Sequence, residues 1–484
     1  MIREHLELIL TLLLLGLAHS LLAIFFPLTG AEAMIWQGGA LEGVSGPYPM
    51  VSWLAGLTKG WELGNWGLRA PVILLHLLTI VGVYVFAWDI SSSRHFALLS
   101  ARLYAIMPLA LVWGVVLNVN APLTMAFTWG AVAAKRAIWD QKVHYWYGLA
   151  LCLALMFLSD GLGLLFLPGL LLILTTKPYR NRLKQKEPYL ALLLLVAMIF
   201  PFYFTSSWGW GRLGWGVEAG PGGLLSLLMS QVISASPFIF IILSLSFMRY
   251  GRTYWRNFQI HPLSPAPFGL FWLSLLLGLA WTPILIFSIF WKLEPGWMAF
   301  LWPLAAVLVA AFVCRGEDSR HLKLVYKKGF LKLTVLLALM IDLPLVIWLL
   351  QPKYILPERM IYLENITSPA QPYGLNQGWE RAGQRLGQII GERFSGEEAP
   401  CLLALKESSA ALYSYHSPGH PLLLTYDPNR IPIGRTCLIV SDDFAFPQKA
   451  GNQDFARIEV LEPLVIRDQE GILQVFHFFI GTPK

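Results

Sequence analysis

Charged side chains are scarce in this chain. Of its 484 residues, Asp, Glu, Lys and Arg make up only 13%, against 56% hydrophobic residues. Soluble domains usually carry about 25% charged residues, so this composition excludes an ordinary soluble protein. Apolar runs close to 20 residues long recur along the sequence, and about 20 apolar residues form a helix that crosses a bilayer. The sequence therefore predicts a polytopic α-helical membrane protein.

Sequence patterns for metal and nucleotide binding are also lacking. The chain has no CxxC, no HExxH and no clustered histidines, which argues against a zinc site. It has no P-loop or dinucleotide-binding glycine fingerprint either, because the Gly-rich stretch 209–223 does not lie between a strand and a helix. We expect that stretch to be an external loop. No cofactor is predicted, and a divalent cation stays an open alternative.

Cysteines are few, and the four of them divide by location. Cys152 and Cys314 lie in or beside apolar runs, and we expect them to be packing residues. Cys401 and Cys437 lie in the C-terminal segment, where an oxidising compartment would allow a disulfide. Their spacing does not show whether they meet.

About eleven membrane spans are predicted. The first apolar run ends in Phe25, Phe26 and Pro27 rather than at a small-residue cleavage site, so we expect a retained span and not a signal peptide. No pair of interrupted spans stands out, which makes a transporter a weaker third reading. The spans lie near 6–26, 70–89, 96–116, 119–137, 145–161, 162–177, 188–206, 224–248, 267–290, 296–314 and 331–351.

Basic residues lie in short loops that fall on one side of the membrane. These loops are residues 135–142, 177–186, 249–256 and 315–328. The positive-inside rule places them, and the N-terminus, in the cytoplasm. They account for the net charge of +7, so a nucleic-acid partner is not expected. We expect the protein in the bacterial inner membrane, with its C-terminal domain in the periplasm.

Two domains are predicted. Residues 1–351 form the transmembrane domain, including an external loop at 27–69 with two amphipathic helices that lie on the membrane surface. Met34, Ile35, Leu41, Val51, Leu54 and Leu57 supply their apolar faces. Residues 352–484 begin with a Pro-rich junction, continue with a helical pattern at 378–394 and end in short strand-like runs. This segment is long enough for an extracytoplasmic α/β domain of its own.

The external loop carries a sequence of short motifs. "AEAMIW" (31–36), "YPMVSWL" (48–54) and "RAP" (69–71) follow in order. They resemble the first external loop of GT-C-fold glycosyltransferases that use polyprenyl-phosphate sugars. That family includes the protein O-mannosyltransferases and the bacterial transferase that adds aminoarabinose to lipid A. Its members carry Asp-Glu-Ala-x-x-Trp, then Pro-Pro-Leu-x-x-Trp-Leu, then Arg-x-Pro.

Later segments extend the resemblance over nearly the whole chain. "NVNAPLTMAFTW" (118–129) is similar to the family's Pro-Asp-Ala-Pro-Leu segment, and "LMFLSDGLGLLFLPGLLLIL" (155–174) to its Ser/Thr-Lys-Gly segment ending in Leu-Pro. "KLEPGWMAFLWPLAAVL" (292–308) resembles its Pro-His-Trp-x-x-Pro segment. The run "ALYSYHSPGHPLL" (411–423) is similar to a family run ending in Phe-Tyr-x-x-Gly-x-Pro. The resemblance rests on two features: these motifs occur in the same order as in the family, and the predicted topology is the same.

Several positions depart from the family pattern. The family's leading acid is replaced by Ala31, so only the second acid remains, as Glu32. Transfer of a sugar from a lipid phosphate needs a base for the acceptor's proton and cations for the departing phosphate. Alanine and amide side chains supply neither, and a carboxylate repels phosphate. The other replaced positions are Pro47, Tyr48, Asn120, Asp160 and Gly296.

Three charged residues have competing readings. Glu32 is the candidate catalytic base, or an acid that complements a helix N-terminus. Arg69 either binds the donor phosphate or reaches to the interface. Arg102 lies inside an apolar run, where a charge usually faces a partner or a cavity; it is the second candidate phosphate ligand, with Asp160 as its candidate partner.

A cavity at the outer leaflet is expected to gather these side chains. For Arg212 and Glu218, which lie in the Gly-rich stretch, a solvated loop is the simpler explanation. The candidate lining residues are Tyr48, Asn118, Asn120, Asp160, Arg212, Glu218 and Trp297.

Two function classes follow from the resemblance. The first is an integral-membrane glycosyltransferase that moves a sugar from a polyprenyl-phosphate donor to an extracytoplasmic acceptor. The second is a catalytically inactive GT-C scaffold that serves as a subunit or as a lipid-carrier-binding partner in a membrane complex. The expected partners are a polyprenyl-phosphate sugar or another lipid, the membrane lipids, and for the second class another membrane protein.

Overall fold

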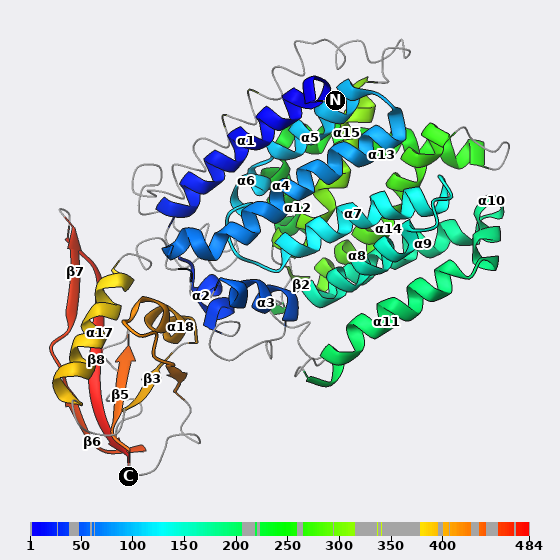
Figure 1. The fold of residues 1–484 in the computed structure, drawn as a ribbon. Coiled ribbons are helices and arrows are strands. Elements are labelled where there is room, and N and C mark those ends of the chain that lie inside the picture. The colour runs from blue at the N-terminus through cyan, green and yellow to red at the C-terminus, as the bar shows by residue number, and fades with distance from the viewer. Residues whose placement is uncertain are drawn as a thin grey trace.

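A bundle of long helices and a small sheet domain make up the computed structural model (Figure 1). It describes residues 2–26, 28–37, 48–58, 61, 63–205, 218–219, 223–258, 265–293, 295–314, 336, 340, 378–394, 400–405, 407–426, 435–441, 454–468 and 471–483. The predicted span 331–351 (apart from residues 336 and 340), the junction at 352–375 and the positions Pro47 and Arg212 lie outside these ranges.

Most predicted spans coincide with helices. They are α1 (Ile2–Phe25), α4 (Gly64–Ser91), α7 (Asn120–Ile138), α8 (Tyr145–Ser159), η2 (Gly161–Leu165) with α9 (Phe166–Thr175), α11 (Glu187–Thr205), α14 (Pro265–Phe290), and η5 (Pro295–Leu301) with α15 (Trp302–Cys314). Between α9 and α11 lie α10 (Lys177–Arg180) and η3 (Asn181–Lys184). Within the described ranges, four helices are long and apolar enough to cross a membrane, or five if one bent pair counts as a span.

Two predicted spans are each interrupted by a break between two helices. The run 96–116 forms α5 (Arg94–Ala105) and α6 (Pro108–Trp113). The run 224–248 forms α12 (Gly223–Ala235) and α13 (Pro237–Phe258), bent by 108°. In both cases a proline begins the second helix, since its fixed φ suits the first turn but it lacks an N–H for the preceding helix. Ser236, with φ 73°, makes the second bend.

Helix α15 lies at the centre of the bundle. The residues from Trp302 to Phe312 are all apolar, and all of them are buried inside the bundle. By contrast, α11 exposes a row of large apolar side chains: Leu190, Leu192, Leu193, Val196 and Phe200. Such exposed apolar rows are stable in lipid and costly in water. The bundle therefore has the surface of an integral membrane protein.

The external loop forms two short helices, as predicted: α2 (Gly30–Trp36) and α3 (Pro49–Leu57). What covers part of their apolar faces differs from the prediction. Val51 and Leu54 are buried inside the protein, in one cluster with residues of α4 and of the C-terminal domain. Leu57 and Trp53 are each 48% exposed and stay candidates for contact with the membrane.

The C-terminal segment folds as a mixed sheet with two helices. The helices are α17 (Trp379–Arg393), at the predicted position, and α18 (Glu407–His416). The strands are β3 (Cys401–Ala404), β4 (Leu424–Thr425), β5 (Cys437–Ser441), β6 (Phe455–Val460), β7 (Leu464–Asp468) and β8 (Gly471–Pro483).

The order across this sheet is β4-β3-β5-β8-β6, and β7 pairs with β8. β3 runs parallel to β4 and β5, whereas β8 is antiparallel to its neighbours. The buried Leu402 and Leu438 lie in one apolar cluster with Trp379 of α17 and Tyr413 of α18. Both helices therefore cover the same face of the sheet.

Candidate functional site

Glu32 begins the site because it caps helix α2. Thr29 precedes the helix, and its hydroxyl accepts a hydrogen bond from the Glu32 backbone N–H. In return, the Glu32 carboxylate accepts hydrogen bonds from the Thr29 N–H at 3.0 Å and the Thr29 hydroxyl at 3.1 Å. This reciprocal arrangement is a capping box, which satisfies backbone groups that the first turn leaves free. The reading of Glu32 as an acid at a helix N-terminus therefore has a direct structural basis.

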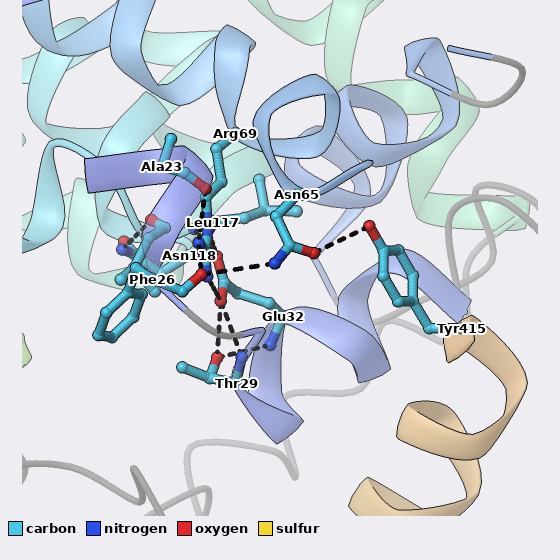
Figure 2. Close-up of polar contacts among 10 residues, drawn as sticks. Ala23, Phe26, Thr29, Glu32, Asn65, Arg69, Leu117, Asn118 and Tyr415 are labelled. Atoms are coloured by element: carbon cyan, nitrogen blue, oxygen red, sulfur yellow. Dashed lines mark hydrogen bonds and ion pairs between the residues drawn. The ribbon is translucent and has the colours of Figure 1, made fainter. Parts of the chain in front are cut away.

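Arg69 of α4 pairs with Glu32 (Figure 2). Its Nε lies 2.8 Å from Glu32 Oε1 and its Nη2 lies 2.6 Å from Oε2, so the contact is bidentate. Both side chains are fully buried. The remaining Nη1 donates to the carbonyls of Ala23 and Phe26 at the end of α1. Arg69 thus joins the ends of three helices.

A third segment completes the surroundings of the carboxylate. The backbone N–H of Leu117 donates to Glu32 Oε1 at 2.9 Å. Next to it, Asn118 Oδ1 accepts from the N–H groups of Asn120 and Ala121 and so caps the start of α7. In total, Glu32 accepts five hydrogen bonds, which occupy the lone-pair directions of both oxygens. No direction is left from which an acceptor could deliver a proton without displacing one of these donors.

The C-terminal domain reaches the same site through its motif-bearing run. Tyr415, at the end of α18, donates a hydrogen bond from its hydroxyl to Asn65 at 3.3 Å, near Arg69 (Figure 2). Burial raises the pKa of Tyr415 to about 12, with nearby Arg69 opposing and Glu32 adding to the shift. Gln37 donates to the Leu423 carbonyl at 3.1 Å. The similarity of residues 411–423 to the family run thus coincides with a contact to the external loop.

A small cavity with a mainly apolar lining and a few polar side chains lies deeper in the bundle. His76 is seven residues beyond Arg69 on α4, about 10 Å along the helix. The cavity has a volume of about 20 Å³, enough for an ordered water. Its polar lining residues are His76, Thr79, Tyr104, Asn120 and Thr124.

His76 is the unusual member of that lining. It is buried, and its Nε2 has no hydrogen-bond partner among the residues described. Its ring lies 4.9 Å from that of His19 on α1, centroid to centroid. Buried polar atoms are nearly always satisfied, so this nitrogen marks a place where water or a hydroxyl group fits. Sequence reasoning missed both histidines, although a histidine inside an apolar run was the available signal.

Gly296 and Trp113 explain one departure from the family pattern. A Cβ added at Gly296 would lie 2.1 Å from the Trp113 ring. The indole therefore occupies the space that a side chain at position 296 would need, and the same indole lines the cavity. The family's histidine at this position cannot be accommodated here unless Trp113 moves.

The other predicted lining residues are dispersed. Asp160 ends α8, and its carboxylate accepts from the Leu162 N–H at 2.8 Å. Trp297 stacks on Phe287, with centroids 6.0 Å apart. Glu218 lies in β1 (Glu218–Ala219), opposite Lys292 of β2 (Trp291–Lys292). Tyr48 is the residue before α3.

The prediction that Asp160 is the partner of Arg102 was wrong. Arg102 forms an ion pair with Glu7 on α1 at 3.0 Å, and both side chains are about half exposed. Glu7 and Phe26 are 19 residues apart on α1, or about 28 Å along a helix. The predicted phosphate ligand therefore lies at the opposite end of α1 from Arg69. Its position in α5, near the break before Pro108, explains the exposure.

Carboxylates and histidines do not gather into a metal site in the described part of the chain. No group of three or more His, Cys, Asp or Glu side chains with suitable spacing occurs there. Glu32, the nearest carboxylate to the expected site, is engaged by Arg69. The described residues therefore give a divalent cation no ligand set to bind.

Comparison with known proteins supports the fold. Residues 45–204 match the family described as dolichyl-phosphate-mannose-protein mannosyltransferase. The crystal structure of ArnT from Cupriavidus metallidurans in the apo state is similar, with a TM-score of 0.64 and 13% identity over 97% of both chains. The structure of the same enzyme bound to undecaprenyl phosphate gives 0.60 and 14%, over 99% of this chain and 98% of that one. No curated protein sequence matches. This chain thus has the GT-C fold of the polyprenyl-phosphate-dependent glycosyltransferases that its sequence resembles.

Proposed function

We propose that this protein is a GT-C scaffold that binds a polyprenyl-phosphate lipid at the extracytoplasmic face and does not carry out transfer with the family's usual residues. The state of Glu32 carries the proposal. It is the acid that remains in the external-loop motif, and five donors hold it in a buried ion pair. A general base needs a free lone pair facing the acceptor. Here Glu32 joins helices instead.

The lipid partner follows from the fold. The similar ArnT structure is described as bound to undecaprenyl phosphate, and the similarity extends over nearly the full length of both chains. A helical bundle with this arrangement offers a lipid tail the same kind of apolar outer surface. In this chain the exposed apolar rows of α1 and α11 supply it. Polyprenyl phosphate, with or without a sugar, is the ligand we propose.

Active sugar transfer is the second candidate, and two observations favour it. Residues from the external loop, from the segment before α7 and from the exported domain still converge near Glu32. The cavity below them has an unpartnered His76 nitrogen beside Asn120. A neutral histidine is the commonest general base in enzymes. A transferase of this kind would use different groups from those of the family.

The proposed location is the bacterial inner membrane, with the N-terminus in the cytoplasm and the sheet domain outside. The loop-charge pattern supports this orientation, because the basic loops after α7 and α9 would then be cytoplasmic. In the scaffold reading, the exported domain offers a surface to another membrane protein. Such a partner would carry the catalytic groups that this chain lacks.

The test combines binding with turnover. Purified full-length protein in detergent is mixed with undecaprenyl phosphate, and bound lipid is counted by native mass spectrometry. The same protein is then assayed for transfer from polyprenyl-phosphate sugars in host membranes. We expect bound lipid without turnover by the purified chain.

Two results would contradict the proposal. If folded wild-type protein binds no undecaprenyl phosphate, polyprenyl phosphate is not its ligand. Clear turnover by the purified chain would favour the transferase instead, and loss of that turnover in His76→Phe would then identify the histidine as its base.

A further inference from the structure

Two cysteines lie opposite each other in the exported domain. β3 and β5 are parallel neighbours, and their register pairs Cys401 directly with Cys437. Adjacent strands are about 4.8 Å apart, within the Cα separations of about 4.4–6.8 Å that disulfides span. Side chains at paired positions point to the same face of a sheet, and both cysteines pack in one cluster with Leu403 and Ile439. Both thiols are free in this structure.

One of the two is open to reagents. Cys401 is the first residue of β3, and β4 pairs only with the later residues Leu403 and Ala404. Cys401 is therefore half-buried at a corner of the sheet, whereas Cys437 is fully buried.

The surroundings also favour the thiolate at the accessible cysteine. A hydrogen bond with Cys437 lowers the pKa of Cys401, and the positive charge of Arg435 acts in the same direction. The same hydrogen bond and burial raise the pKa of Cys437. An accessible thiolate beside a buried thiol is the arrangement of an attacking cysteine with its resolving partner.

We propose that Cys401 and Cys437 form a reactive dithiol that low-molecular-weight disulfides oxidise to a disulfide across β3 and β5. The Cys401 thiolate attacks one sulfur of the reagent and breaks its S–S bond, so that a mixed disulfide forms and one thiolate leaves. The Cys437 thiol then loses its proton and attacks the Cys401 sulfur, which releases the second thiolate. Two electrons pass from the protein to the reagent, and one proton, that of the Cys437 thiol, is released.

The product links two strands that come from distant parts of the domain. Thirty-five residues lie between the cysteines, so the bond closes a long loop in the unfolded chain. Oxidation should therefore raise the thermal midpoint of the exported domain.

The experiment counts thiols in the folded full-length protein. Protein in detergent is incubated with oxidised or reduced glutathione, denatured, and labelled with a polyethylene-glycol maleimide that shifts each free cysteine on a gel. We expect four labels after reduction and two after oxidation, the latter on Cys152 and Cys314. Mass spectrometry of the digest should find the peptides of Cys401 and Cys437 joined.

Matched variants separate this bond from other oxidation. Cys401→Ser should keep three labels under both conditions. Cys437→Ser should keep three after reduction and two after oxidation, because Cys401 stays in the mixed disulfide with glutathione when the resolving thiol is missing. Cys152→Ala should still lose two labels on oxidation. If either serine variant fails to fold, the joined peptide in wild type decides the matter. Four labels after oxidation, a joined peptide that includes Cys152 or Cys314, or a covalent dimer would each overturn the proposal.

Discussion

At the residue scale, Glu32 and Arg69 depend on each other. Both side chains are fully buried. Removing either one therefore leaves the other charged group with neither its partner nor water. A buried charge without a partner costs several kcal/mol. The pair also sets the geometry of the external loop, because the same guanidinium binds the end of α1. Its role in stability can therefore be separated from any role in catalysis.

Replacing Glu32 by Gln should destabilise the protein by about 3–5 kcal/mol, the usual cost of breaking a buried pair by removing one partner. The double variant Glu32→Gln with Arg69→Met should recover part of that loss, because no isolated charge remains. Thermal or denaturant unfolding in detergent measures both. Glu7→Gln is the matched control, since its pair with Arg102 is exposed and should contribute less than about 1 kcal/mol. Equal effects of the two single variants would contradict this role for the buried pair.

Gly296→Ala should cost about 1–3 kcal/mol through overpacking. Its new Cβ would lie 2.1 Å from the Trp113 ring, which must move. The penalty should nearly vanish when Trp113 is also changed to Ala. Gly278→Ala on α14 is the control, because nothing lies within 4 Å of its added Cβ. Unfolding midpoints of the four proteins test the expectation, and a penalty that survives the double change would refute it.

Sequence reasoning reached Glu32 but not its partners. Its position at the start of a helix was a local signal, and the capping box confirms that reading. The pairing with Arg69 spans 37 residues and the contact with Leu117 spans 85. No local pattern encodes such distances. Arg102 was misplaced for the same reason, because its partner Glu7 is 95 residues away.

At the element scale, helices were easier to predict than breaks in them. α1, α4 and α7 follow the predicted spans closely, because long apolar runs permit little else in a membrane. The breaks at Pro108 and Ser236 were missed, since proline is tolerated within membrane helices when neighbours satisfy the backbone. The apolar faces of α2 and α3 were predicted, but their contact with the exported domain was not. Apolar residues do not reveal whether lipid or protein covers them.

Helix α18 should make stability depend on pH. Burial lowers the pKa of His416 to about 4, and nearby His420 acts in the same direction. The unfolded chain, with a pKa near 6.5, binds the proton more readily than the folded one. The free energy of unfolding therefore falls as pH drops from about 6.5 to 4, by up to about 3 kcal/mol.

Unfolding midpoints of full-length protein between pH 7.5 and 4.5 check this dependence. His416→Gln should show a shallower decline than wild type over that window. His95→Gln changes an exposed histidine on α5 and serves as the control. Identical slopes for wild type and His416→Gln would exclude His416 as the source.

At the scale of the whole molecule, the C-terminal domain is held to the bundle by the loop that carries α2 and α3. The Trp36 ring makes edge contacts with Tyr415 at 5.0 Å and with His420 at 5.1 Å. Gln37 adds its hydrogen bond to the Leu423 carbonyl. These contacts belong to an apolar cluster that includes both domains. A cut in the junction between them should therefore leave the two parts associated.

Protease added outside intact cells should cut between residues 352 and 375, and the sheet domain should stay bound to the membrane. Trp36→Ala should release it, because the variant removes the ring on which α18 packs. Trp53→Ala is the control, since that side chain on α3 is 48% exposed. Immunoblots of membrane and supernatant fractions give the answer. Cleavage only after lysis would refute the orientation, and release from wild type would refute the docking.

The partners of Glu32 also impose an order on biosynthesis. Thr29 is available as soon as the loop is made, but Arg69 follows 37 residues after Glu32 and the Leu117 N–H follows 85 residues after it. Until then the loop carries a carboxylate that is costly to place in lipid, which keeps it in the aqueous phase beside the translocon. The loop therefore reaches its final place only after α4 and the α5–α6 pair have entered the membrane. A nascent chain stalled before Leu117 should leave Glu32 and Ala33, which are fully buried in the finished protein, open to water-soluble labels.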